Sequence, residues 1–288
     1  MKIKILYIQS FKLLGLISIL SLSENSFAQL TKLGVQQGQK FYVETLVKGN
    51  TSATVMGQTM DGTTESKSTT LYEILGTGPD GIDLQRTITK MRFDASMMGQ
   101  NASFDSDKKD NEGPLADTLS KKINKAITFT LDAKGTIIKR EVMEDGSIGN
   151  AMGVTGSGQE PVTDLFIPAL IGRELKAGEI FIDSIIVKKE KYESHETGTY
   201  TITAIENGIA EIEYKGTQVT SVAMIQMEME MVSAANNVIK SQLQLDIKTG
   251  VLLARTTVME SIISTEIAGM SLPSSGTTTT SIKISPVL

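Results

Sequence analysis

The chain has no cysteine, no tryptophan and a single histidine among its 288 residues. Without cysteine it can form no disulfide, no thiolate nucleophile, no zinc-finger or iron–sulfur site and no lipid-modified N-terminal cysteine. One imidazole excludes metal sites that need several histidines and leaves one candidate general base. The formal net charge of −5 provides no basic surface for nucleic acid or for an anionic membrane. We therefore expect no cofactor and no nucleic-acid partner.

Residues 1–28 have the three regions of a cleavable export signal. A lysine-containing start is followed by the ten-residue apolar stretch Leu13–Leu22, and the small residues Ser26 and Ala28 then precede Gln29. The apolar stretch is shorter than the roughly 20 residues that span a bilayer, which argues against the alternative of an uncleaved anchor helix. We expect cleavage between Ala28 and Gln29, a mature chain without a transmembrane span, and a periplasmic or extracellular location.

Four sequence landmarks occur twice and in the same order along the chain. They are a phenylalanine after a Gly-Gln or Gly-Glu pair (Phe41, Phe181), a tyrosine before a glycine turn (Tyr72, Tyr200), a Leu-Asp turn (Leu131, Leu245) and an arginine before Val-Met-Glu (Arg140, Arg255). Repeated landmarks in one order favour an internal duplication. We predict a first β repeat over residues 29–145, a linker and helix over 146–175 and a second β repeat over 176–288.

Most of the chain has the pattern of antiparallel β structure. Ile225–Val232 alternates apolar and polar residues, as in a strand with one solvated face. Asn207-Gly208 predicts a type I′ hairpin turn, since both central residues of that turn need positive φ. Longer turns are expected at Asp132–Gly135 and Asp246–Gly250, and a last strand within Ser271–Ser285.

Two segments have helical spacing instead. Apolar residues recur every four positions within Leu115–Lys125, directly after Pro114, and Val162–Ile171 fits the apolar helix template, with Pro168 expected to kink or shorten it. Each predicted helix has an apolar stripe that needs a concave apolar surface to cover. The sequence thus predicts a mainly β fold, in which duplicated antiparallel units form a curved sheet or half-barrel with short helices covering the concave face. A β-sandwich and a closed barrel are the alternatives.

The order of these motifs, together with Phe104-Asp105-Ser106, resembles a family of exported proteins of unknown function that is common in the Bacteroidota. The resemblance covers roughly residues 33–285. That family is distantly similar to the half-barrel of periplasmic lipoprotein carriers. What the resemblance implies is an open apolar cavity that could hold an acyl chain, and it supplies no functional residue.

Residues that could carry catalysis or bind a metal have simpler explanations. His195 is expected in a solvated loop between two strands, without the Gly-x-Ser-x-Gly motif of a serine nucleophile. The densest acidic cluster comprises Asp105, Asp107, Asp110 and Glu112. Lys109 takes the third ligand position of a calcium loop there, so we expect a solvated acidic loop. Gly153–Gly158 is predicted to be a linker, because it lacks the preceding strand and the following lysine of a phosphate-binding loop. We expect no catalytic residue, no metal site and no enzyme.

Fourteen methionines beside eight phenylalanines suggest a soft, adaptable apolar wall, although ordinary core filling and a thioether copper site are alternatives. The candidate ligand-binding residues are Met97, Met227, Met229, Met231, Leu165, Phe166 and Leu119. The sequence favours a non-catalytic exported module that binds an acyl chain, a lipidated protein or a hydrophobic peptide in a concave sheet. The alternative is a structural or interaction protein of the cell envelope with a filled core, no ligand and an unknown protein partner.

Overall fold

The computed structural model describes residues 28–30, 33–55, 57–79, 81–97, 100–140, 164–226, 229–267 and 269–287. The expected export signal up to Phe27 and the expected linker over residues 146–163 lie outside these ranges. None of the helices within them has the length and apolar content that a bilayer crossing requires.

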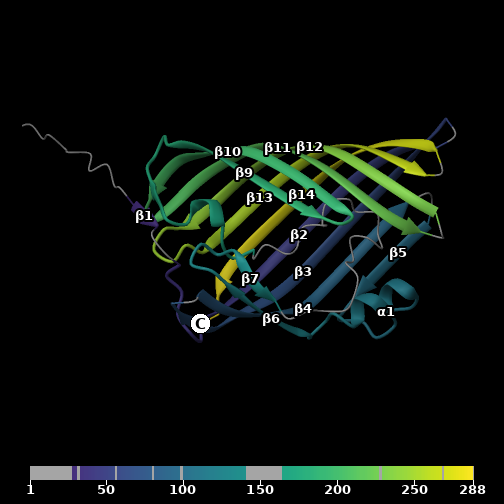
Figure 1. The fold of residues 1–288 in the computed structure, drawn as a ribbon. Helices are drawn as coiled ribbons and strands as arrows, with labels where there is room; N and C mark the ends of the chain where they lie inside the picture. The colour runs from purple at the N-terminus through teal and green to yellow at the C-terminus, as the bar shows by residue number, and fades with distance from the viewer. Residues whose placement is uncertain are drawn as a thin grey trace, which may run out of the picture.

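One 12-stranded antiparallel sheet contains almost all of the described chain (Figure 1). Its order is β7-β6-β4-β3-β2-β14-β13-β12-β11-β10-β9, with β5 also paired to β4. The strands of its first half are β2 (Lys40–Val55), β3 (Gln58–Gly78), β4 (Gly81–Met97), β5 (Gln100–Asp105), β6 (Ala126–Leu131) and β7 (Ile137–Arg140). Those of its second half are β9 (Ile180–Lys189), β10 (Tyr192–Glu206), β11 (Ile209–Gln226), β12 (Met229–Asp246), β13 (Leu252–Ile267) and β14 (Met270–Pro286).

The sheet curves into a trough and does not close on itself. Figure 1 shows β9 and β10 on one wall and β4 and β6 on the other, with β14 and β2 between them. Within the described ranges, β9 forms one outer edge, and β7 and β5 lie at the other. A separate two-stranded sheet joins β1 (Ala28–Leu30) to β8 (Arg173–Leu175). The predicted fold class, a mainly β curved sheet, is confirmed.

Alternation of side chains makes these long strands two-sided. In β12, the odd-numbered residues from Ser233 to Leu245 are buried and the even-numbered residues between them are mostly exposed. Successive side chains of a strand point to opposite faces, so one face of the sheet carries the buried side chains. We call this concave side the inner face and the opposite side the outer face.

The outer face carries charged side chains together with exposed apolar ones such as Ile182 and Ile262. Ion pairs on it include Lys40–Glu73, Lys48–Glu65 and Lys215–Glu213, at 3.0, 3.3 and 3.1 Å. Exposed pairs of this kind add little to stability, but charges of both signs mark a surface in contact with water.

The landmark residues of the two halves occupy matching places. Phe41 lies opposite Tyr72 across β2 and β3, and Phe181 lies opposite Tyr200 across β9 and β10. The Gly38 N–H donates to the carbonyl of Ile74 (2.8 Å), and the Gly178 N–H donates to that of Ile202 (2.7 Å).

Irregularities of the two halves match as well. The β3–β4 register shifts between Ile74 and Gly76, and the β10–β11 register shifts between Ile202 and Ala204. A second pair of shifts lies directly before Leu131 and directly before Leu245. Since a β-bulge is a specific feature of a strand pair, shared bulges support the predicted repeat, whose boundaries remain a prediction.

The main apolar core fills the inner face at one end of the sheet, and both halves contribute to it. Its fully buried strand residues include Val43, Tyr72, Ile74, Leu84, Leu131, Ile202, Leu245 and Leu252. Residues 164–175 add the buried side chains of Leu165, Phe166, Leu170 and Leu175 to the same core. This segment, which we call the plug segment, therefore fills that end of the trough, which we call its base.

The predicted second helix is wrong in its extent. Within Val162–Ile171, the described part forms a turn at residues 164–165 and the short 3-10 helix η1 (Pro168–Leu170). Pro168 lacks an N–H and disfavours helical backbone at the residue before it, and Ile167 is indeed extended, with φ −116° and ψ 100°. The apolar spacing reflects a buried irregular segment.

The predicted first helix is real but shorter than Leu115–Lys125. The helix α1 (Pro114–Ser120) has proline in its first turn, and i→i−3 hydrogen bonds from Lys122 and Ile123 tighten its end. Asn124 then adopts a left-handed φ of 58°, which ends any helix. Leu119 is buried against Phe93 and Phe104 in a second, smaller cluster.

The predicted strand Ile225–Val232 is also wrong, because the chain reverses within it. β11 ends at Gln226 and β12 begins at Met229, and these two residues pair across a hairpin. Period-two alternation continues on both sides of a tight turn, so alternation alone does not reveal the reversal. The type I′ turn at Asn207-Gly208 is confirmed, with φ of 52° and 80°.

Candidate binding face of the sheet

One line of inner-face residues, each paired with the next across neighbouring strands, crosses the sheet beyond the end that the core fills. We call it the cross-sheet row. From β9 to β4 it consists of Ile185, Glu196, Gln218, Asn237, Ser261, Gly276, Thr51, Gly62 and Met97. The two apolar ends, Ile185 and Met97, are each 47% exposed, whereas Gln218 and Asn237 are buried. The row thus has exposed apolar ends and a polar middle.

An aromatic ladder connects the plug segment to this row. The Arg173 guanidinium lies 4.3 Å from the ring centroid of Phe181, in cation–π geometry. Phe181 stacks on Tyr200 at 5.2 Å, and Tyr200 lies 4.6 Å from Tyr214 in tilted geometry. These contacts fix the direction of the Tyr214 side chain along the inner face.

Two glycines make room for Tyr214. Gly198 and Gly216 lie opposite each other on β10 and β11. A β-carbon at either position would overlap the Tyr214 side chain. Glycine inside a strand is expected where another group approaches the backbone closely, and the tyrosine ring does so here.

Tyr214 begins a chain of hydrogen bonds through the row. Its hydroxyl donates to Glu196 Oε1 (2.5 Å), Gln218 Nε2 donates to Glu196 Oε2 (2.9 Å), and Asn237 Nδ2 donates to Gln218 Oε1 (2.9 Å). Asn237 Oδ1 is buried and accepts no hydrogen bond from the described residues. The chain holds the half-buried Glu196 carboxylate in one orientation on the inner face.

Burial shifts the tyrosines of the ladder toward their protonated form. Burial raises the pKa of the Tyr214 hydroxyl, and its hydrogen bond to Glu196 adds to the effect. Burial also raises the pKa of Tyr200, with a further contribution from the nearby charge of Asp183. Both hydroxyls therefore stay neutral, and that of Tyr214 donates to the Glu196 carboxylate.

A second polar group holds the plug segment to the sheet. Arg255 Nη2 lies 3.7 Å from Asp164 Oδ1, and the Leu252 N–H donates to the Leu165 carbonyl at 2.8 Å. Burial raises the pKa of the Tyr72 hydroxyl, and the nearby charge of Asp164 raises it further. Arg255 and Asp164 thus fix where the core segment enters the trough.

The structure separates the predicted ligand-binding residues instead of bringing them together. Leu165 and Phe166 belong to the filled base of the trough, and Leu119 lies in the separate cluster at α1. Met97 ends the cross-sheet row on β4 and is half exposed. Met231 on β12 is half buried.

The remaining two methionines cannot be assigned a contact. Met227 lies outside the described residues, and Met229 is described only by its backbone pairing with Gln226. Among the predicted residues, Met97 alone lies on the cross-sheet row.

His195 lies within β10, and the prediction of a loop position is wrong. It is exposed on the outer face, where its Nε2 lies 3.2 Å from Ser184 Oγ and 3.3 Å from Thr197 Oγ1. A serine nucleophile needs its base and oxyanion donors in a site that excludes water, and this exposed sheet surface does not provide one.

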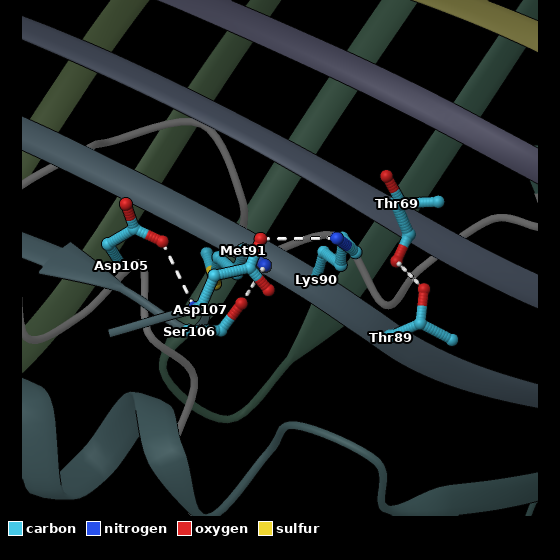
Figure 2. Close-up of polar contacts among 7 residues, drawn as sticks. All are labelled: Thr69, Thr89, Lys90, Met91, Asp105, Ser106 and Asp107. Atoms are coloured by element: carbon cyan, nitrogen blue, oxygen red, sulfur yellow. Dashed lines mark hydrogen bonds and ion pairs between the residues drawn. The ribbon is translucent and has the colours of Figure 1, made fainter. Parts of the chain in front are cut away.

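The acidic residues 105–112 form a turn that is held by its own hydrogen bonds. Asp105 Oδ1 accepts from the Asp107 N–H (3.1 Å), and Asp107 Oδ2 pairs with Lys90 Nζ (3.1 Å) (Figure 2). Ser106 Oγ accepts from the Met91 N–H (2.9 Å), and Asn111 closes the loop on Asp105. The side chains therefore join the turn to β4.

Sequence reasoning missed Tyr214, Glu196, Gln218 and Asn237. One signal was available, namely the two glycines in the interiors of otherwise regular strands, Gly198 and Gly216. The polar residues themselves give no signal, since polar residues alternate along every strand with one solvated face.

Comparison with known proteins gives no family for this chain: no family model and no curated protein matches it. Two solved structures show some likeness. An outer membrane channel from Pseudomonas putida F1 is 8% identical, with a TM-score of 0.25 over 88% of this chain and 98% of that chain. OccK7 (OpdD) from Pseudomonas aeruginosa is 8% identical, with a TM-score of 0.27 over 87% and 99%. TM-scores this low do not establish a shared fold. The resemblance to exported Bacteroidota proteins stays a prediction.

Proposed function

We propose that this protein is a non-catalytic, exported β-rich module that binds an apolar ligand on the exposed part of its inner face. The observation that carries the proposal is the cross-sheet row. Ile185 and Met97 are each 47% exposed on the concave side of the sheet. Apolar side chains facing a concavity are the usual lining of sites for apolar ligands. Export rests on the signal expected in residues 1–28.

The ligand should also carry a hydrogen-bond donor. Glu196 lies directly opposite Ile185 in the row, and its carboxylate is held by Tyr214 and Gln218. A carboxylate accepts hydrogen bonds and favours a cationic or N–H-bearing group. A hydrophobic peptide, or an acylated molecule with an amine or amide, meets both requirements.

The filled base favours a second candidate, a structural or interaction module without a ligand. Leu165, Phe166 and Leu170 are 0–2% exposed, as in an ordinary close-packed core. In that case the exposed ends of the row would have no occupant, and function would lie on the loops.

Two fluorescent probes that share a dodecyl chain, one with an amine head and one with a carboxylate head, test the proposal. We expect the protein to bind the amine probe more tightly. Met97→Asp should weaken binding of the carboxylate probe at least tenfold, since roughly 1.4 kcal/mol of apolar contact is lost and the new carboxylate repels that of the probe. Glu196→Gln should remove the preference for the amine and leave the carboxylate probe bound.

Ile262→Asp is the matched control, because Ile262 is 71% exposed on the outer face of β13. It should leave both affinities unchanged. Absence of probe binding to the unmodified protein would contradict the proposal, and so would an equal loss in Ile262→Asp and Met97→Asp. Either result would favour the module without a ligand.

A further inference from the structure

β9 is a long and regular free edge of the sheet. Its ten residues pair with β10 without a register shift, and no described strand pairs with its other side. Natural edge strands are protected by prolines, bulges, charged side chains or short length. β9 has neither proline nor bulge, and its charged residues are Asp183 and, at its end, Lys188 and Lys189. At the opposite edge, β7 is only four residues long and β5 only six. The backbone groups that β9 does not direct toward β10 can therefore pair with another strand.

The outer side of β9 is apolar and exposed. Ile180, Ile182 and Ile186 are 64%, 69% and 67% exposed, and Ser184 lies between them. Their neighbours on β10 are polar, since Ile182 lies opposite Thr199 and Ile186 lies opposite His195. Three large apolar side chains along one edge strand indicate a contact surface.

We propose that a second copy of this chain covers this edge, with the two β9 strands pairing antiparallel about a two-fold axis at Ser184. In this register Ile182 lies opposite Ile186 of the second copy, and the two-fold axis makes this pair occur twice. Glu179 lies opposite Lys189 of the second copy, so that opposite charges face each other. The strand is then its own complement, as a two-fold interface requires.

Neighbouring registers are less favourable. With the axis at Asp183, that carboxylate would face its own copy, and like charges directly opposite each other destabilise a strand pair. With the axis at Ile185, Ile182 would face Lys188 and Phe181 would face Lys189. The register at Ser184 avoids a contact of Asp183 with its own copy, pairs Ile182 with Ile186 twice and places Glu179 opposite Lys189, although Ile180 then lies opposite Lys188.

Cross-linking tests both the dimer and its register, because the chain has no cysteine of its own. Across a two-fold axis, the two Cα atoms of residue 184 would be about 4.5–5.5 Å apart, within the range for a disulfide. We expect purified Ser184→Cys to cross-link rapidly under mild oxidation. Ser275→Cys, which is exposed on the outer face of the interior strand β14, should stay reduced.

Sedimentation velocity gives the independent readout. The unmodified protein should be a dimer at micromolar concentration, and Ile182→Lys should be a monomer with an unchanged circular dichroism spectrum. Ile262→Lys, equally exposed on an interior strand, should remain a dimer. A monomeric unmodified protein, or equal cross-linking of Ser184→Cys and Ser275→Cys, would overturn the proposal. Binding of the dodecyl probes is measured separately, so failure of one proposal is distinguishable from failure of the other.

Discussion

At the scale of the residue, Tyr214 shows how a glycine pair can specify a polar network. The ring occupies the space that β-carbons at Gly198 and Gly216 would take, and its hydroxyl reaches Glu196 only along that path. The network therefore depends on two residues that take no part in its hydrogen bonds.

Gly198→Ala should displace the Tyr214 ring and break its bond to Glu196. We expect a loss of about 1–3 kcal/mol in the free energy of unfolding, which is typical of overpacking in a well-packed site. Gly78→Ala is the control, since a β-carbon there would contact nothing within 4 Å. Urea unfolding measures both, and equal stability of the two variants would contradict the role given to Gly198.

At the scale of the element, residues 164–175 act as a plug although they contain almost no regular structure. Their side chains reach full burial because the sheet supplies the walls, and Arg255 and the Leu252 N–H fix the entry of the segment. The apolar spacing that predicted a helix is the spacing of side chains packed into the base of the trough.

Leu165→Asp should expel this plug, because an unpaired buried carboxylate is costly. We expect a loss of several kcal/mol in stability and increased binding of a dye that reports exposed apolar surface. Leu75→Asp, at a position 38% exposed, should change both much less. Unchanged thermal stability and dye binding in Leu165→Asp would show that the segment does not close the base.

At the scale of the whole molecule, the two halves form one sheet and share its main core. β14 pairs with β13 on one side and with β2 on the other, so it joins the halves along its length. Residues of both halves lie in the same apolar cluster. The smaller cluster around Leu119 belongs to the first half alone.

We expect the protein to unfold in a single transition. Far-ultraviolet circular dichroism and tyrosine fluorescence should give the same midpoint, as for other cooperative units. Leu84→Ala in the first half should lower that common midpoint in both signals. Two separated transitions would instead show that the halves fold independently.

The β class, the type I′ turn and the matching landmarks were predictable from the sequence, because each depends on neighbours a few residues apart. Asn207 and Gly208 need positive φ whatever surrounds them, and Phe41 and Phe181 stand in similar local motifs. The extent of the helices was not predictable in the same way. Apolar residues at helical spacing also suit an irregular segment that is surrounded by a sheet.

The sequence by itself determined that this is a β protein without thiol or multi-histidine chemistry, since composition and alternation are local properties. The tertiary structure alone decided that Glu196, Gln218 and Asn237 lie side by side and that Leu165 and Met97 belong to different places. Register between strands far apart in sequence makes these choices, and a shift of one residue would turn every side chain of a strand to the other face.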